Sequence, residues 1–173
     1  MFDQLARNPT VQDQLRSLNR AARTTGISER VQAYRDAIWT ETVRMFPAAV
    51  MSPRQAKVDT ELHGARIPGG TLALIVPYVS QRDARRWPAP EAFDPRRHLG
   101  SGARAELKKD LIAFGHGAHA CIGRELSRRM AGAALSSLGE DVVLTPLGEE
   151  AKPAGFMLMA PHADVHVQVR GVE

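Results

Sequence analysis

The one cysteine of the chain, Cys121, lies in a glycine-rich segment directly before a stretch with helical periodicity. Glycines let the backbone approach another group closely, and a helix N-terminus favours the anionic form of a thiol. A thiolate in such a place can serve as a metal ligand or as a nucleophile. The alternative is a buried structural cysteine, which is the common state of a lone free thiol. A single cysteine also excludes an internal disulfide framework.

The spacing around this cysteine favours the ligand interpretation. Residues 114–123 contain the pattern Phe-x-x-Gly-x-His-x-Cys-x-Gly. This pattern resembles the haem-binding signature of the cytochrome P450 monooxygenases, and the chain is similar to a bacterial-type soluble member of that family. The five matching positions are Phe114, Gly117, His119, Cys121 and Gly123.

Two further segments resemble motifs of the same family and occur in the same order. Residues 41–44 resemble its Glu-x-x-Arg helix motif, and residues 93–98 resemble its meander segment with an Arg. A Glu and an Arg three positions apart on a helix can pair, while the guanidinium keeps N–H groups for a third charged group. An ordinary exposed pair is the alternative for these two residues alone. The resemblance implies an interior salt-bridge network of Glu41, Arg44 and Arg97.

The resemblance also implies roles around a bound haem b. Cys121 is implied as the axial thiolate ligand of the haem iron, and no other catalytic residue is assigned. His119 and Arg54 are implied to bind haem propionates, because both side chains suit a carboxylate. Phe114 is implied to pack beside the sulfur. The glycines implied to let the loop lie close to the porphyrin are Gly115, Gly117 and Gly123.

The function implied by the resemblance is haem-thiolate oxygenation, in which one oxygen atom of O2 is inserted into an apolar substrate. Electrons are implied to come from NAD(P)H through a ferredoxin or a reductase-type donor. The resemblance covers only the C-terminal half of the family's fold, so we expect the oxygen-side half to be missing from this chain. Two hypotheses follow: an enzyme completed by a separate N-terminal half, or a truncated or split member that acts only as a haem-binding or partner-binding module.

Two other functional classes are disfavoured. His116, His119 and Cys121 are residue types that bind zinc. A structural zinc site needs four ligands, however, and no second Cys or paired His has a usual spacing. The Arg-rich stretches are interleaved with acids and lack an aromatic stacking platform, so nucleic acid is not an expected partner. The remaining histidines are scattered, and we expect them in solvent or in turns: His63, His98, His162 and His166.

Proline, glycine and apolar spacing predict the elements that must position these residues. The expected fold class is mainly α with small antiparallel β-sheets, in one partial domain over residues 1–173 that corresponds to the C-terminal half of the cytochrome P450 fold. The predicted elements are a helix from Pro9 to near Gly26, a helix from a Ser28 cap to Phe46, a small sheet with strands at 61–66 and 71–76, an irregular meander over 80–113, a helix from Cys121 to Gly139, and terminal strands at 142–144, 156–159 and 165–169.

The composition is that of a folded protein. The 173 residues are 43% hydrophobic and 24% charged, with a net charge of +4, which excludes a disordered tail or a fibrous repeat. The N-terminal residues show no basic-then-apolar signal, and the longest apolar run, 72–76, is too short to span a bilayer. We therefore expect no membrane segment in this chain and a cytoplasmic location.

Overall fold

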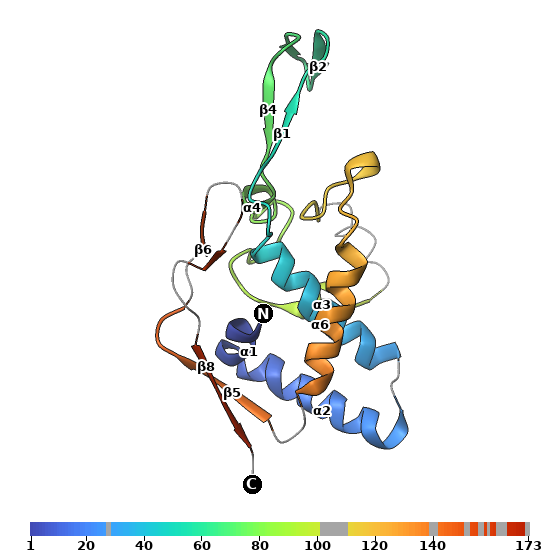
Figure 1. Cartoon of the computed structure of the whole chain (residues 1–173), viewed down its shortest axis with the longest axis vertical. Coiled ribbons are helices and arrows are strands. Elements are labelled where there is room, and N and C mark those ends of the chain that lie inside the picture. Colours follow the sequence, from blue (N-terminus) through green and yellow to red (C-terminus); the bar gives the residue numbers. More distant parts are fainter. Residues whose placement is uncertain are drawn as a thin grey trace.

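The computed structural model describes residues 1–26, 29–100, 111–138, 142–150, 153–155, 158, 160–161 and 166–171. Helices form the body, small two-stranded antiparallel sheets lie around it, and one β-ribbon extends away from it (Figure 1). This is the predicted mainly α fold with small antiparallel sheets. The elements in chain order are α1 (Phe2–Arg7), α2 (Pro9–Thr25), α3 (Glu29–Met45), β1 (Ser52–Gln55), β2 (Thr60–Leu62), β3 (Ala65–Ile67), β4 (Leu72–Ile75), α4 (Pro77–Ser80), the 3₁₀ helices η1 (Pro95–His98) and η2 (Gly117–His119), α6 (Arg124–Ser137), β5 (Val142–Leu147), β6 (Pro153–Ala154), β7 (Ala160–Pro161) and β8 (His166–Gly171).

Local signals set the ends of α2 and α3. Pro9 lies in the first turn of α2, where its missing N–H removes no helical hydrogen bond, and Gly26 ends that helix with a φ of 83°. α3 ends at Met45, two residues before Pro47, because a proline disfavours the helical conformation in the residue before it. Both helices have the predicted positions. The predicted cap, Ser28, lies outside the described residues.

Buried apolar side chains join α1, α2, α3, α6 and β5 in one core. α3 contributes the face that its spacing predicts, with Tyr34 and Ile38 almost wholly buried. The short helix α1, which packs against β5 and β8, is absent from the prediction because six residues are too few to show helical periodicity. Among the described residues, no helix has both the length and the apolar character needed to cross a bilayer. The central cluster consists of Leu5, Ala6, Leu15, Tyr34, Ile38, Met45, Phe93, Leu135 and Leu144.

A buried amide on α2 holds the C-terminal end of α6. Asn19 Nδ2 donates to the carbonyl oxygens of Leu135 and Leu138, both at 2.9 Å. Its Oδ1 accepts from Arg35 of α3, at 2.8 Å from Nη2 and 3.2 Å from Nε. The last carbonyls of a helix have no partner within that helix. Asn19 therefore caps α6 and joins three helices at one point.

The β-ribbon differs from the predicted pair of strands. β1 pairs antiparallel with β4, and β2 pairs antiparallel with β3. The predicted strand 61–66 is interrupted by a two-residue turn, His63-Gly64, in which both residues have positive φ (49° and 82°). Two positive φ values in succession are typical of the tight turn that joins two antiparallel strands. The prediction is wrong here because it places the reversal only at 67–70.

The predicted meander is irregular and returns to the body. Its described parts, 80–100 and 111–113, contain turns and the short helix η1. Trp87 and Pro95 are fully buried within this stretch, and η1 packs against α3. This irregular stretch therefore packs against α3 through η1 and contributes buried side chains to the interior.

α6 begins at Arg124, three residues after the predicted start at Cys121. The Cys121 N–H donates to the carbonyl oxygen of Phe114 at 2.8 Å, so this residue closes the preceding loop. The first hydrogen bond of the α-helical i to i−4 type that involves Gly123 joins the Ser127 N–H to the Gly123 carbonyl oxygen at 2.9 Å. The predicted stop, Gly139, lies outside the described residues.

The C-terminal strands form a hairpin-like pair. β5 and β8 are antiparallel, with Val142 opposite Gly171 and Leu147 opposite His166. The predicted strands at 142–144 and around residues 167 and 169 are confirmed. Of the predicted strand 156–159, only Leu158 is described, and it makes an isolated antiparallel bridge with Ala49; residue 165 also lies outside the described residues.

Candidate functional site

The cysteine loop is closed by hydrogen bonds within its own backbone. Besides the bond from the Cys121 N–H to the Phe114 carbonyl, the Gly115 N–H donates to the Ile112 carbonyl at 2.9 Å, and the Ala120 N–H donates to the Gly117 carbonyl at 3.0 Å. Cys121 is a free and exposed cysteine. The alternative of a buried structural cysteine is therefore wrong for this fold.

Glycine is required at two positions of this loop. Gly115 and Gly117 have φ values of 65° and 64°, a conformation that residues with a side chain rarely adopt. A Cβ at Gly115 would in addition lie 3.1 Å from the His119 carbonyl oxygen. A Cβ at Gly123 would lie at an ordinary contact distance, 3.7 Å, from the Cys121 Sγ. The first two glycines therefore shape the loop, whereas Gly123 lies beside the sulfur.

Trp39 on α3 contacts both flanks of the cysteine. Its ring stacks on the ring of Phe114, with centroids 5.3 Å apart and an interplanar angle of 21°. Its indole N–H donates to Ser127 Oγ on α6 at 3.1 Å. The Arg124 guanidinium, at the start of α6, lies 5.9 Å from the centroid of the Phe114 ring. The Phe114 ring is thus held by α3 and by the start of α6, and the loop is fixed between these two helices.

The two residues expected to bind propionates are both exposed and lie on different elements. His119 ends η2, two residues before the cysteine. Arg54 lies on β1, where it is paired with Ala73 of β4. The Arg54 Nη1 donates to Ser52 Oγ and to the Pro53 carbonyl oxygen, both at 2.8 Å. Its guanidinium remains exposed.

Exposed apolar side chains begin directly after the cysteine and continue along α6. Ile122 is wholly exposed, and Leu126 and Met130 are 63% and 64% exposed. Their helical spacing, continued by Ala133 and Ser137, is the periodicity that predicts this helix. The side of α6 that faces the core instead contributes Leu135, so this spacing marks the helix correctly without marking its buried face.

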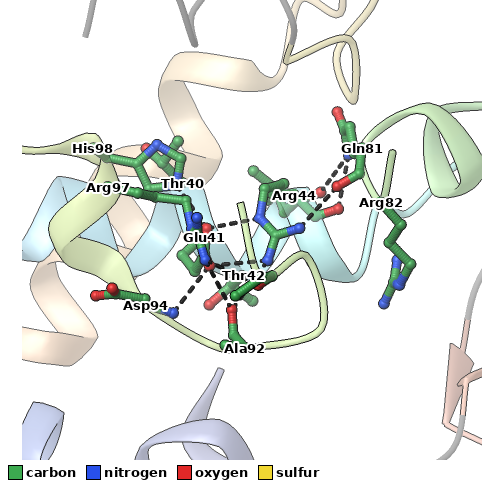
Figure 2. A network of polar contacts seen from close by, with 12 residues as sticks. Thr40, Glu41, Thr42, Arg44, Gln81, Arg82, Ala92, Asp94, Arg97 and His98 are labelled. Carbon is green, nitrogen blue, oxygen red and sulfur yellow. Dashed lines mark hydrogen bonds and ion pairs between the residues drawn. The ribbon is translucent and has the colours of Figure 1, made fainter. Parts of the chain in front are cut away.

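Glu41 and Arg44 of α3 and Arg97 of η1 lie together in one cluster of ion pairs. The Glu41 and Arg44 side chains are fully buried, and the Arg97 side chain is 10% exposed. Arg44 Nε and Nη2 donate to the two carboxylate oxygens of Glu41 at 2.8 and 2.9 Å, and Arg97 Nε donates to Glu41 Oε1 at 2.9 Å (Figure 2). Because Glu41 and Arg44 are fully buried and the Arg97 side chain is largely covered, these contacts differ in kind from exposed helix pairs.

Backbone carbonyl oxygens accept further hydrogen bonds from both arginines. Arg44 Nη1 donates to the Gln81 carbonyl at 2.8 Å, and Arg97 Nη1 donates to the Pro88 carbonyl at 2.8 Å. Both guanidiniums also reach the Ala92 carbonyl at 3.3 Å. The network therefore fastens the meander to α3 at several points.

His98 belongs to the same network, which corrects the expectation that it lies in solvent or a turn. It is 6% exposed, and its Nε2 lies 2.7 Å from Glu41 Oε2. Since the carboxylate is ionised, the proton between these atoms is on the imidazole, and Nε2 donates. Of the other three histidines, His63 and His166 are exposed as expected, and His162 lies outside the described residues.

The pKa of Glu41 shows which effect dominates. Burial by itself would raise the pKa of this carboxyl group. The hydrogen bonds from His98 and Arg44, the charge of Arg44 and the Asp94 N–H at 3.0 Å together lower the pKa from its ordinary value of 4.5 to about 2. The donors outweigh the desolvation, so the buried carboxylate is stable as an anion at neutral pH.

This shift predicts a specific pH dependence of stability. A lowered folded-state pKa stabilises the folded protein above the unfolded pKa, near 4.5, and the contribution is lost as the pH falls towards 2. We expect this group to contribute about 3 kcal/mol to that loss, from about 1.4 kcal/mol for each pKa unit. Denaturant unfolding of the wild-type protein and of Glu41→Gln between these pH values measures it. Equal pH slopes in the two proteins would contradict the prediction.

The described residues contain no group of three or more His, Cys, Asp and Glu side chains arranged to hold a metal ion. Among the described residues, the geometry therefore gives two separate features: a single exposed thiol on a glycine-shaped loop, and a buried Glu-Arg-Arg-His network. A sequence profile described as Cytochrome P450 matches residues 1–147. The chain belongs to the cytochrome P450 family.

Individual relatives agree with this assignment. This cytochrome P450 chain is 37% identical over 93 residues to thromboxane-A synthase of Sus scrofa, a match that covers 54% of the chain and 17% of the relative. It is 34% identical over 122 residues to cyclooctatin synthase of Streptomyces melanosporofaciens, covering 70% of the chain and 27% of the relative. Cyclooctat-9-en-7-ol 5-monooxygenase of the same organism is 36% identical over 94 residues, covering 54% and 20%. The chain thus matches between about a sixth and a quarter of the length of these relatives.

Three contributors to the site in this cytochrome P450 chain are absent from the sequence prediction. They are Trp39, which contacts both flanks of Cys121, and Gln81 and His98, which contact the buried network. None of them carries a signal at short range, because each has its partner dozens of positions away along the chain. His98 directly follows the predicted Arg97, and that adjacency is the one hint that the sequence offers.

Proposed function

We propose that this chain provides the thiolate side of a haem site, with Cys121 as the iron ligand. The observation that carries the proposal is the exposed lone thiol on a loop with the family's signature. The thiol makes no disulfide, and its loop is held by Trp39, by Phe114 and by backbone hydrogen bonds. A thiolate that is both accessible and fixed in place meets the requirement of a permanent metal ligand.

The residues around the thiol fit a haem. The apolar side chains of Ile122, Leu126 and Met130 are exposed on the segment that follows the cysteine and suit contact with a flat apolar macrocycle. His119 and Arg54 are exposed donors, and a guanidinium or imidazole binds a carboxylate strongly. When bound, haem with an axial thiolate supplies activation of O2 by electron donation that favours O–O cleavage.

The protein's own contribution is to position the ligand. Cys121 presents its sulfur from the end of the loop, while His119 and Arg54 orient the propionates. The Glu41 network acts at a distance from the thiol: it ties α3 to the meander and so fixes the helix on which Trp39 lies. These roles leave the cofactor to perform the redox chemistry and the chain to orient it.

The reaction that we propose for the protein containing this chain is monooxygenation, the insertion of one oxygen atom of O2 into an apolar substrate. The electrons would come from NAD(P)H through a ferredoxin or reductase-type donor. The proposal is supported by the family membership and by relatives such as the one named as a 5-monooxygenase. Haem binding without oxygenation is the second hypothesis and is an outcome of the same experiment.

The test is reconstitution of the protein with haem, reduction under carbon monoxide and measurement of the Soret band. We expect a red-shifted band of the thiolate type. Haem dimethyl ester, which lacks free propionates, is the matched ligand control, and we expect weaker binding of it because the His119 and Arg54 contacts are lost. A Soret band without the red shift would contradict thiolate ligation. Isotopically labelled O2, with a reductase system, then decides whether an oxygen atom reaches a product.

A further inference from the structure

Gln81 lies between the buried charge network and the cysteine loop. It follows α4 directly and is fully buried. Its main-chain carbonyl accepts from Arg44 Nη1 at 2.8 Å, so the residue is itself held by the network (Figure 2). A buried amide side chain must find partners for both its donor and its acceptor end. The partners of these two ends determine what Gln81 can do.

The donor end of Gln81 caps α3. Its Nε2 donates to the Arg44 carbonyl at 2.8 Å and to the Val43 carbonyl at 3.3 Å. These carbonyls lie in the last turn of α3, where no partner is available within the helix. This end of the amide is therefore fixed to the helix that carries Glu41, Arg44 and Trp39.

The acceptor end of Gln81 contacts the start of the cysteine loop. Its Oε1 accepts the Ile112 N–H at 2.9 Å. The Ile112 carbonyl accepts the Gly115 N–H at 2.9 Å, and the Phe114 carbonyl accepts the Cys121 N–H at 2.8 Å. Hydrogen bonds thus run from the end of α3 through one side chain into the turn at 112–115, and from that turn to the cysteine.

We propose that Gln81 is a positioning residue for Cys121. It transfers the position of α3, fixed by the buried network, to the loop that presents the thiol. The expected effect of Gln81 on haem ligation rests on the proposed function, whereas its expected effect on the position of the loop does not. Glutamine suits this role because one amide supplies a donor for the helix carbonyls and an acceptor for the Ile112 N–H.

Gln12 provides a matched control. It is also a buried glutamine, 5% exposed, and its amide likewise joins backbone groups of distant elements. Its Nε2 donates to the Leu5 and Leu144 carbonyls at 3.3 and 3.1 Å, and its Oε1 accepts the Leu144 N–H at 2.6 Å. Gln12→Leu and Gln81→Leu remove the same chemistry, but only the second lies next to the cysteine loop.

The first experiment is amide hydrogen exchange on the full chain without haem. In the wild-type protein we expect the Ile112 N–H to be protected. In Gln81→Leu we expect it to exchange about tenfold faster, since about 1.4 kcal/mol is the order of one hydrogen bond. We expect the Cys121 N–H to exchange faster as well. Gln12→Leu should leave both amides unchanged and affect the Leu144 N–H instead.

A conservative variant separates positioning from loss of general stability. Gln81→Glu keeps an acceptor for the Ile112 N–H but, in its ionised form, has no proton to donate to the Arg44 carbonyl. We expect it to restore the protection of Ile112 relative to Gln81→Leu, even where its overall stability is lower. Global unfolding free energies of all variants, measured in denaturant, identify any exchange that results from whole-chain unfolding.

The spectroscopic readout uses the haem-reconstituted proteins under carbon monoxide. We expect Gln81→Leu to show a larger fraction of the Soret band without the red shift than Gln12→Leu of equal stability. If the wild-type protein binds no haem, the proposed function fails while the exchange result still tests Gln81. An unprotected Ile112 N–H in the wild-type protein, or equal effects of Gln81→Leu and Gln12→Leu on the loop amides, would overturn the inference.

Discussion

Replacement of Cys121 by alanine is expected to abolish the red-shifted Soret band of the reduced, carbon monoxide-bound protein completely. The thiolate is the proposed source of that shift, and the described residues contain no second cysteine and no cluster of alternative ligands. Because the side chain is exposed, its removal should leave the unfolding free energy nearly unchanged. We therefore expect the red-shifted band to be lost without a matching loss of stability.

His116→Ala is the control for this experiment. His116 lies in the same loop, is also exposed and is the other kind of side chain that could bind iron. We expect the variant to keep the red-shifted band. A shifted band that survives in Cys121→Ala, or one that disappears in His116→Ala, would show that the sulfur is not the ligand.

Replacement of Arg44 by alanine is expected to reduce the unfolding free energy by about 3 to 5 kcal/mol, because it leaves a buried carboxylate without its main partner. Arg44 donates to both oxygens of Glu41 and to the Gln81 and Ala92 carbonyls. Its guanidinium also lies 5.4 Å from the centroid of the buried Trp87 ring. Denaturant unfolding at neutral pH measures the loss.

Two comparisons make this result specific. Arg129→Ala removes an exposed helix partner of Glu125, and we expect almost no change in stability because exposed pairs contribute little. Arg44→Lys keeps the charge without the planar fork that reaches both carboxylate oxygens, so we expect it to recover only part of the loss. A loss for Arg44→Ala as small as that for Arg129→Ala would contradict a structural role for the network.

Much of this architecture follows from short-range patterns. The ends of α2 and α3 depend on Pro9, Gly26 and Pro47, and the buried face of α3 follows its apolar spacing. The cysteine loop is recognised from the resemblance of residues 114–123 to the family's signature, and the positive φ values of Gly115 and Gly117 are a local requirement for glycine. The strand pairing of 52–75 was predicted less well, since the choice between two possible turns depends on which strands meet in space.

By itself the sequence determined the family motif and the ligand candidate Cys121 within residues 114–123, and the Glu41–Arg44 pair within one helical turn. Arg97 follows from the resemblance of residues 93–98 to the family's meander segment, since its contact with Glu41 spans 56 positions. Only the tertiary structure decided which other side chains act with them. Glu41 meets His98 across 57 positions, Gln81 meets Ile112 across 31, and Trp39 meets Ser127 across 88. A hydrogen bond needs two groups at a defined distance and direction, and for residues so far apart only the path of the folded backbone sets that geometry.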